Sequence, residues 1–399
     1  MGMCSNAAGG LDASAQPNND ARSNDQGQGP REVAAHVCRP GAAQRRSSHV
    51  KDRCRVGGRK KSVVDTELHV DSNDADDGYS SVSSGDGEGN LIRCNGHTYH
   101  GSGDIFVPND ESERARLEIQ HGLFGLCLDG KLTFTTLPDP DTLDHPMSIL
   151  DIGAGTGIWA TEMGERYPTA RIRGIDVSST LLPTVVPPNV VFEVADANEP
   201  WGAIDGGGDE SSLNLDFVHV RNIVGGGVRD LKRLFQQAFE HLRPGGQIEV
   251  SEVRNRWFLF ENSELDGDTK DEADGLEACQ ELVANFAWMA EKVGVDFDPI
   301  TSVRALLEEV GFERAVEMSD LVPFAPAGVD ERMRHKGAQL ALLIEYGLEN
   351  YALRVFSSCG WKEEDTRDLI RRVLLENKRV GKRTFGKTTF VTARKPTSV

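Results

Sequence analysis

The chain reads Ile149-Leu150-Asp151-Ile152-Gly153-Ala154-Gly155-Thr156-Gly157, so a short apolar strand runs directly into three alternate glycines. Glycine adopts positive φ at little cost and, because it lacks a Cβ, lets the backbone approach a ligand closely. Residues 158–167 then have the pattern of a helix, whose N-terminal N–H groups would face the same ligand. Strand, glycine loop and helix together predict a pocket for a nucleotide cofactor.

The spacing of the glycines distinguishes two kinds of cofactor. A dinucleotide fingerprint, Gly-x-Gly-x-x-Gly, needs its third glycine where this chain has Ile158, one residue after Gly157. Asp151 precedes the first glycine by two residues, and its negative charge disfavours a pyrophosphate but suits the ammonium and sulfonium of S-adenosylmethionine. The pattern resembles the first motif of class I, Rossmann-like methyltransferases. This resemblance implies S-adenosylmethionine bound at Asp151, Gly153, Ala154, Gly155, Thr156 and Gly157.

Three later strand ends carry polar residues in the order that this fold needs. Residues 171–177 alternate and end in Asp176-Val177, where a carboxylate can accept hydrogen bonds from both ribose hydroxyls. The β-branched run 190–194 leads to Asp196-Ala197-Asn198, and the methyltransferase resemblance places an acceptor for the adenine amino group there. A fourth strand over 215–220 ends at Arg221, which we expect to orient the cofactor carboxylate or the methyl acceptor.

The periodicity of the remaining sequence predicts an α/β fold with a seven-stranded, mostly parallel sheet and flanking helices. Prolines 183, 187 and 188 remove the usual helix between the second and third strands. Pro244-Gly245-Gly246 predicts a turn before a fifth strand over 247–253. Two more strands are expected at 313–324 and 383–393, and helices at 109–126, 158–167, 229–241, 276–293, 300–310, 332–357 and 363–379.

We therefore expect a methyltransferase domain over residues 91–399. Its core should span about 146–255, with helical cap insertions at about 256–310 and 331–380. An acidic loop over 261–274 separates the core from the first cap helix.

Residues 1–90 differ in composition from the rest, and we expect a disordered, charged tail. They are rich in Gly, Ser, Asn, Asp and Gln without an apolar period, so they cannot bury enough surface to fold. Arg31 to Lys61 holds ten basic residues against two acidic ones, whereas Asp65 to Glu88 holds eight acids and no base. The basic block is consistent either with a nuclear import signal or with a solvated polyampholyte.

Bulk properties exclude several classes of function. The first 90 residues sum to −2 of the total charge of −19, and an acidic remainder repels phosphate backbones, so direct nucleic-acid binding is not expected. Seven cysteines without Cys-x-x-Cys pairs indicate neither a disulfide framework nor a zinc site. No apolar stretch is long enough for a membrane span, and the N-terminus lacks the core of a secretory signal. We expect a soluble intracellular protein without a metal.

Beyond the glycine loop, stretches along residues 95–396 resemble a narrower group. They include Gly155-Thr156-Gly157-Ile158-Trp159-Ala160, Val186-Pro187-Pro188-Asn189-Val190 and Ala238-Phe239-Glu240-His241-Leu242-Arg243-Pro244-Gly245-Gly246. These are similar to the fungal LaeA-type methyltransferases, the velvet-complex regulators of secondary metabolism and development. The resemblance implies a nuclear regulator that associates with velvet-family proteins. The alternative is a cytosolic methyltransferase that modifies a small molecule on oxygen or nitrogen in a secondary-metabolite pathway.

The sequence alone does not identify a catalytic residue. Methyl transfer from a sulfonium is driven mainly by holding donor and acceptor in line, and a base is needed only when the acceptor must lose a proton. His121, His219, Arg221 and Glu252 are the polar candidates near the carboxyl edge of the sheet. A buried strand histidine is the more frequent role for His219, and Arg221 is the stronger candidate. Val224-Gly225-Gly226-Gly227 and the glycine-rich loop 205–212 depart from the family pattern on the acceptor side.

Overall fold

The computed structural model describes residues 80–82, 91–139, 142–201, 213–254, 256–259, 275–327 and 330–397. The predicted disordered tail lies outside these residues, apart from strand β1 (Ser80–Val82), which pairs with a neighbour and so departs from that prediction. The glycine-rich loop 205–212 and the acidic loop 261–274 also lie outside them.

Seven strands form the main sheet in the order β10-β11-β8-β7-β4-β5-β6, and a short β9 (Phe258–Leu259) pairs with β11. The parallel part consists of β4 (Ser148–Ile152), β5 (Arg171–Asp176), β6 (Val190–Val194), β7 (Leu215–Arg221) and β8 (Leu242–Val253). The final strand β11 (Thr384–Arg394) runs antiparallel between β8 and β10 (Glu313–Pro323). The predicted mostly parallel, seven-stranded sheet is confirmed.

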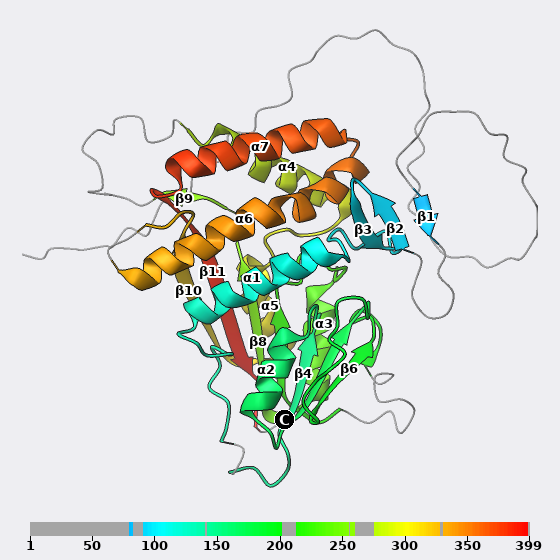
Figure 1. Ribbon diagram of the computed structural model, residues 1–399. Helices are drawn as coiled ribbons and strands as arrows, with labels where there is room; N and C mark the ends of the chain where they lie inside the picture. Colours follow the sequence, from blue (N-terminus) through cyan, green and yellow to red (C-terminus); the bar gives the residue numbers. More distant parts are fainter. Residues whose placement is uncertain are drawn as a thin grey trace, which may run out of the picture.

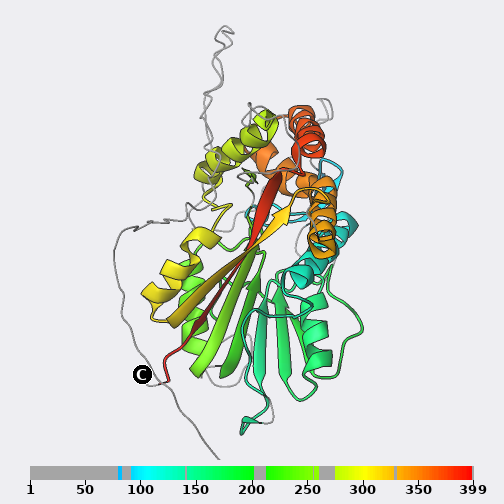
Figure 2. The ribbon, with the colours of Figure 1, turned by 90° about the vertical axis from the view of Figure 1, so that its left-hand side faces the viewer.

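Helices cover both faces of this sheet, as Figure 2 shows with α2 and α5 on opposite sides. On one face α2 (Ile158–Arg166) packs Trp159, Ala160 and Met163 against β4 and β5. On the other face lie α3 (Leu231–His241) and α5 (Ile300–Val310). The connection from β5 to β6, all of whose residues are described, contains no helix, as the prolines predicted.

A helical cap stands above the carboxyl end of the sheet (Figure 1). It consists of α4 (Glu277–Val293), α6 (Glu331–Ser358) and α7 (Glu363–Val380), joined by α1 (Glu111–Cys127), which packs along α6. Apolar side chains from all four helices form one core cluster. The predicted cap insertion over 256–310 is wrong for α5. Its apolar face packs with α3 against one face of the main sheet instead.

Two local features also differ from expectation. Residues 244–246 do not form a separate turn, since β8 begins at Leu242 directly after α3 and absorbs them with an irregular register. Strands β1, β2 (Leu91–Cys94) and β3 (His97–His100) form a small antiparallel sheet that the sequence did not predict. The segment after β3 reaches the loop that follows β7, where Ile105 forms an isolated antiparallel bridge with Gly226.

Candidate functional site

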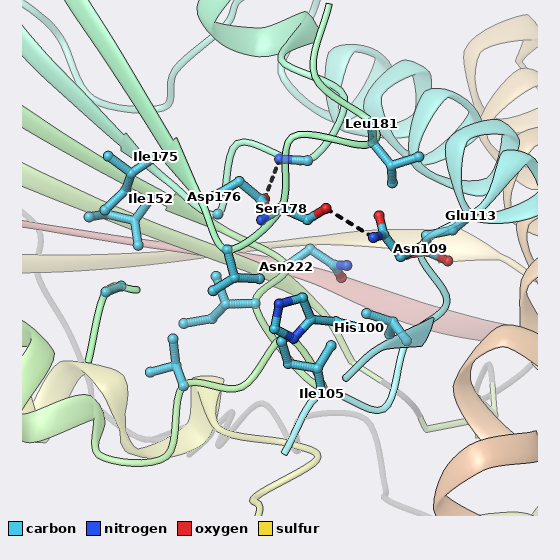
Figure 3. Close-up of a pocket in the computed structure, with 18 of the residues that line it drawn as sticks. His100, Ile105, Asn109, Glu113, Ile152, Ile175, Asp176, Ser178, Leu181 and Asn222 are labelled. Atoms are coloured by element: carbon cyan, nitrogen blue, oxygen red, sulfur yellow. Dashed lines mark hydrogen bonds between the residues drawn. The ribbon is translucent and has the colours of Figure 1, made fainter. Parts of the chain in front are cut away.

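The carboxyl ends of β4, β5 and β6 open into a pocket of about 920 Å³. Figure 3 shows Ile152 and Ile175 at the strand ends on one side, with His100 and Ile105 across the opening. Of the residues predicted to bind the cofactor, the lining includes Gly153, Gly155, Asp176, Val177, Asp196, Ala197 and Asn198. Motifs spread over 45 positions of sequence thus meet at one place.

The glycine loop forms the floor of this pocket. Gly153, Gly155 and Gly157 all have positive φ, at 69°, 58° and 70°. A Cβ on Gly155 would stand 3.1 Å from the Leu117 side chain and would project into space that the pocket occupies. The loop therefore provides the close backbone approach for which glycine is needed.

Asp176 joins the loop to β5. One of its oxygens accepts the Gly155 N–H at 2.8 Å, and the other accepts the Ser178 N–H at 3.1 Å. A carboxylate offers about four lone-pair sites, so both oxygens can still accept hydroxyl groups from a ligand. Burial raises the pKa of Asp176 to about 6, against the lowering effect of these N–H bonds.

The third motif lies at the next strand end. Asp196 is exposed, and its Oδ1 accepts hydrogen bonds from the backbone N–H and side-chain amide of Asn198, at 2.9 and 2.7 Å. The same amide also donates to the carbonyl of Gly227 at 3.1 Å, which joins the β6 end to the glycine segment after β7. This segment also accepts the Phe106 N–H at the Gly225 carbonyl. It thereby holds the segment that covers the pocket.

Sequence reasoning missed the wall that α1 supplies. Asp110 caps the helix with hydrogen bonds from Ser112 and Glu113 N–H. The preceding Asn109 donates to the hydroxyl of Ser178 at 2.9 Å (Figure 3). It also donates to the hydroxyl of Thr180 at 3.1 Å, and so fixes the helix start to the loop after β5. The capping signal was visible in the sequence, but its distance from the glycine loop concealed the contact.

A polar recess of about 400 Å³ continues from the pocket across the glycine loop. Asp151 accepts a hydrogen bond from Nδ1 of His219 at 2.7 Å, and the His219 ring stacks on Trp159 with centroids 3.6 Å apart. His219 is only 1% exposed, consistent with a buried strand histidine that orients Asp151. Ala154 and Thr156 complete this side of the recess.

Arg221 enters the same recess from β7. Its guanidinium donates to Nδ1 of His121 at 3.0 Å, and Nε2 of His121 lies 3.0 Å from Glu162. Because arginine has no acceptor, the His121 proton must be on Nε2, directed at the Glu162 carboxylate. Burial and the Arg221 charge lower the pKa of His121, which favours this neutral form. Arg221 therefore presents a cation near the glycine loop.

A hydrogen-bonded partition closes the acceptor side of both cavities. Gln120 donates to Oδ1 of Asn222 at 2.7 Å, and Asn222 donates to the Tyr351 hydroxyl at 2.9 Å. Arg116 contacts both Gln120 and Tyr351 while forming a buried, bidentate pair with Glu113. Asn222 has a φ of 54°, a conformation that asparagine tolerates better than most residues.

Gly157 lies elsewhere than the sequence suggested. It is not in the described lining of either cavity; it begins α2, where a Cβ would come within 2.6 Å of Phe192 and Pro183. Glu252 lies near the carboxyl edge of the sheet, as expected, at the end of β8, where its Oε1 accepts the Ile223 N–H at 2.9 Å. Burial raises the pKa of Glu252 to about 8. Among the described residues, no group of His, Cys, Asp or Glu could hold a metal ion.

The residues present fit S-adenosylmethionine. The glycine cradle has no Cβ to obstruct the cofactor, and Asp176 can accept the ribose hydroxyls while Asp196 to Asn198 border the adenine side. Across the loop, Asp151 suits an ammonium and Arg221 suits a carboxylate. An amino-acid end group has both charges, so the recess matches the methionine portion.

Comparisons with known proteins agree with this geometry. A family model described as a methyltransferase domain matches residues 119–316. The methyltransferase pytC of Aspergillus terreus is 31% identical over 68% of this chain and 77% of its own length. The secondary metabolism regulator LAE1 of Cochliobolus heterostrophus is 30% identical over 64% of this chain and 78% of its own. The secondary metabolism regulator laeA of Gibberella zeae is 30% identical over 74% of this chain and 88% of its own length.

The glycine-loop pocket and these relatives support the same assignment. The chain belongs to the LaeA-type class I methyltransferases and uses S-adenosylmethionine as its cofactor.

Proposed function

We propose that this methyltransferase modifies a small molecule of a fungal secondary-metabolite pathway. The observation that carries the proposal is the roof over the acceptor side of the pocket. Gln120 of α1, Asn222 after β7 and Tyr351 of the cap helix α6 close that side. A site that is covered in this way favours a small acceptor, which the pocket can enclose. It disfavours a protein substrate, whose surface would have to dock from outside. The similarity to pytC, which is named a methyltransferase, supports methyl transfer as the activity.

The residues of this chain hold the reactants. When bound, S-adenosylmethionine would supply an electrophilic methyl group on its sulfonium, and an acceptor heteroatom that takes the methyl group would lose its proton to solvent. Asp176 and Arg221 fix the two ends of the donor, and His219 acts through Asp151 as a positioning residue. Such orientation is the main contribution to the rate.

A second candidate role is that of a nuclear regulator of secondary metabolism and development within a velvet-type complex. Two relatives named secondary metabolism regulators support it, as does the basic block from Arg31 to Lys61. In this role the partners are velvet-family proteins, and the protein resides in the nucleus rather than the cytoplasm.

Deleting the gene in its native host separates the two roles. The small-molecule role predicts that one unmethylated intermediate, lighter than the lost product by about one CH2 group, accumulates while cluster transcripts stay unchanged. The regulatory role predicts that transcripts of whole clusters fall. Unchanged transcripts with no lost product would contradict both.

Imaging and affinity capture test the regulatory role directly. A fluorescent fusion of the full chain should concentrate in nuclei, and deletion of residues 1–90 should disperse it, if the basic block is the import signal. Capture from native cells with mass spectrometry should then recover velvet-family proteins. A cytosolic full-length fusion without such partners counts against this role.

A further inference from the structure

His121 of α1 stands between two side chains of opposite charge, Arg221 at the end of β7 and Glu162 on α2. The guanidinium of Arg221 lies 3.0 Å from Nδ1 of His121, and the Glu162 carboxylate lies 3.0 Å from Nε2 of the same ring. His121 and Arg221 both line the polar recess beside the glycine loop. The imidazole ring therefore contacts both the cation and the anion and keeps them apart.

Arg221 has donors to spare for a ligand. Within the described ranges, its guanidinium forms one hydrogen bond, the one to His121, and it lies over the Phe124 ring, 5.0 Å from the ring centre. A guanidinium carries five N–H donors, so most of those on Arg221 are not used by the protein. Burial lowers the pKa of Arg221, and the charges of three nearby carboxylates oppose this effect. A group in this position is built to meet an anion.

The neutral ring of His121 preserves the charge of Arg221. Its Nδ1 accepts from Arg221, so its proton is on Nε2 and faces Glu162. Glu162 is 42% exposed and can be solvated without a cation. If the two charged groups met directly, the carboxylate would bind the guanidinium on two of its N–H groups and turn it away from the recess. The ring prevents this pairing.

We propose that His121 is a positioning residue, which keeps the guanidinium of Arg221 away from Glu162 and directed at the carboxylate of the cofactor's amino-acid portion. Asp151, which lines the same recess, then faces the ammonium of that portion. Because its Nδ1 lone pair is occupied by Arg221, His121 takes no proton from the acceptor. The inference extends the role given to Arg221 above and does not depend on which acceptor receives the methyl group.

Two ligands that differ only beyond the sulfur atom isolate this end of the site. S-adenosylhomocysteine carries the amino-acid portion, and methylthioadenosine has a methyl group in its place. In calorimetry, His121→Phe should weaken the binding of S-adenosylhomocysteine at least about tenfold and leave that of methylthioadenosine unchanged. The control is His335→Phe, at an exposed histidine that also faces a glutamate, and it should change neither affinity.

Two further variants distinguish positioning from a packing role. His121→Asn places an oxygen near the position of Nδ1, so it should keep the affinity for S-adenosylhomocysteine within about threefold of the unaltered chain. In the His121→Phe background, Glu162→Gln removes the anion that competes for Arg221. The double variant should therefore bind S-adenosylhomocysteine at least about threefold more tightly than His121→Phe alone. A loss of packing would be repaired by neither change.

Four results would overturn the inference: unchanged binding of S-adenosylhomocysteine by His121→Phe, equal weakening of both ligands, His121→Asn as weak as His121→Phe, and no recovery in the double variant. If His121→Phe fails to fold, His121→Leu takes its place. Arg221→Met shows which step is wrong. If it weakens S-adenosylhomocysteine while His121→Phe does not, Arg221 binds the carboxylate without help from His121; if neither does, Arg221 does not bind the cofactor. The pathway role is tested separately, by metabolites and transcripts.

Discussion

At the scale of single residues, the Gly155–Asp176 contact explains why two motifs 21 positions apart act as one site. The backbone N–H that the glycine presents is held by the carboxylate that we predict to accept the ribose hydroxyls. The shape of the loop and the charge of the pocket are therefore coupled. A change at either residue should alter cofactor binding in a recognisable way.

Cofactor affinity should fall in acid because Asp176 must be ionised to accept two hydroxyl groups. Its pKa is raised to about 6, so the carboxylate is formed above that pH and protonated below it. We expect constant affinity at neutral pH and a loss of about tenfold for each pH unit well below 6. Calorimetric titration across this range measures it. Asp176→Asn should bind more weakly and lack the acid dependence; an identical pH profile would contradict the assignment.

Substitution of Gly155 should abolish cofactor binding. Gly155→Arg combines a strained φ with a side chain in the pocket, whereas Gly130→Arg introduces the same residue at a φ of 77° with no atom within 4 Å. The Gly130 variant therefore controls for backbone strain. Isothermal calorimetry should show at least about a 100-fold weaker affinity for Gly155→Arg only. Retained binding by Gly155→Arg would refute the pocket assignment.

At the scale of elements, α1 connects the cofactor pocket and the recess. Glu113, Arg116 and Leu117 line the cofactor pocket, and Leu117, Gln120 and His121 line the recess. Its hydrogen bonds to Asn350 and Tyr351 hold it against α6. This helix therefore joins the cap to the cofactor-binding half.

Removing Arg116 should destabilise the protein strongly. The Arg116–Glu113 pair is buried, so Arg116→Ala leaves the Glu113 carboxylate without its cation and should cost roughly 3–5 kcal/mol of unfolding free energy. Arg114→Ala removes a more exposed partner of Glu111 on the same helix and should cost less than about 1 kcal/mol. Urea denaturation measures both. Equal losses would show that the buried network contributes little.

At the scale of the whole molecule, β11 ties the sheet and cap together. Its side chains enter different core clusters. Phe390 packs with the cap helices, whereas Val391 and Ala393 pack in the cluster that α3 and α5 form on one face of the sheet. Figure 2 shows β10 and β11 rising from the sheet into the cap. Of the helices in the described ranges, none has the length and apolar character that a membrane crossing needs.

Because the two cores share this strand, the described domain should unfold in one transition. Cofactor at a concentration of about 100 times its Kd should stabilise the folded state by about 2.7 kcal/mol. The single unfolding transition should then shift as a whole to a higher temperature. Differential scanning calorimetry gives the measurement, with agreement between calorimetric and van't Hoff enthalpies as the criterion. Two peaks, of which the cofactor shifts only one, would show that cap and sheet are independent units.

Most of the fold could be predicted because its signals are local. The glycine loop, the strand-end carboxylates and the three prolines act through neighbours in sequence, and helices α1, α4, α5, α6 and α7 were placed within a few residues. The small sheet of β1, β2 and β3 escaped prediction because its strands are short and all three contain polar residues. Assignment of α5 to the cap failed because periodicity shows which face is apolar, not which core receives it.

The sequence by itself determined the methyltransferase fold, the cofactor and the motifs Gly153–Gly157, Asp176 and Asp196. These follow from backbone conformation and strand ends, which neighbouring residues dictate. Only the tertiary structure decided that Gln120, Asn222 and Tyr351 form a partition and that His121 stands between Arg221 and Glu162. Gln120 and Tyr351 are 231 positions apart, and only the packing of α1 on α6 brings their side chains together.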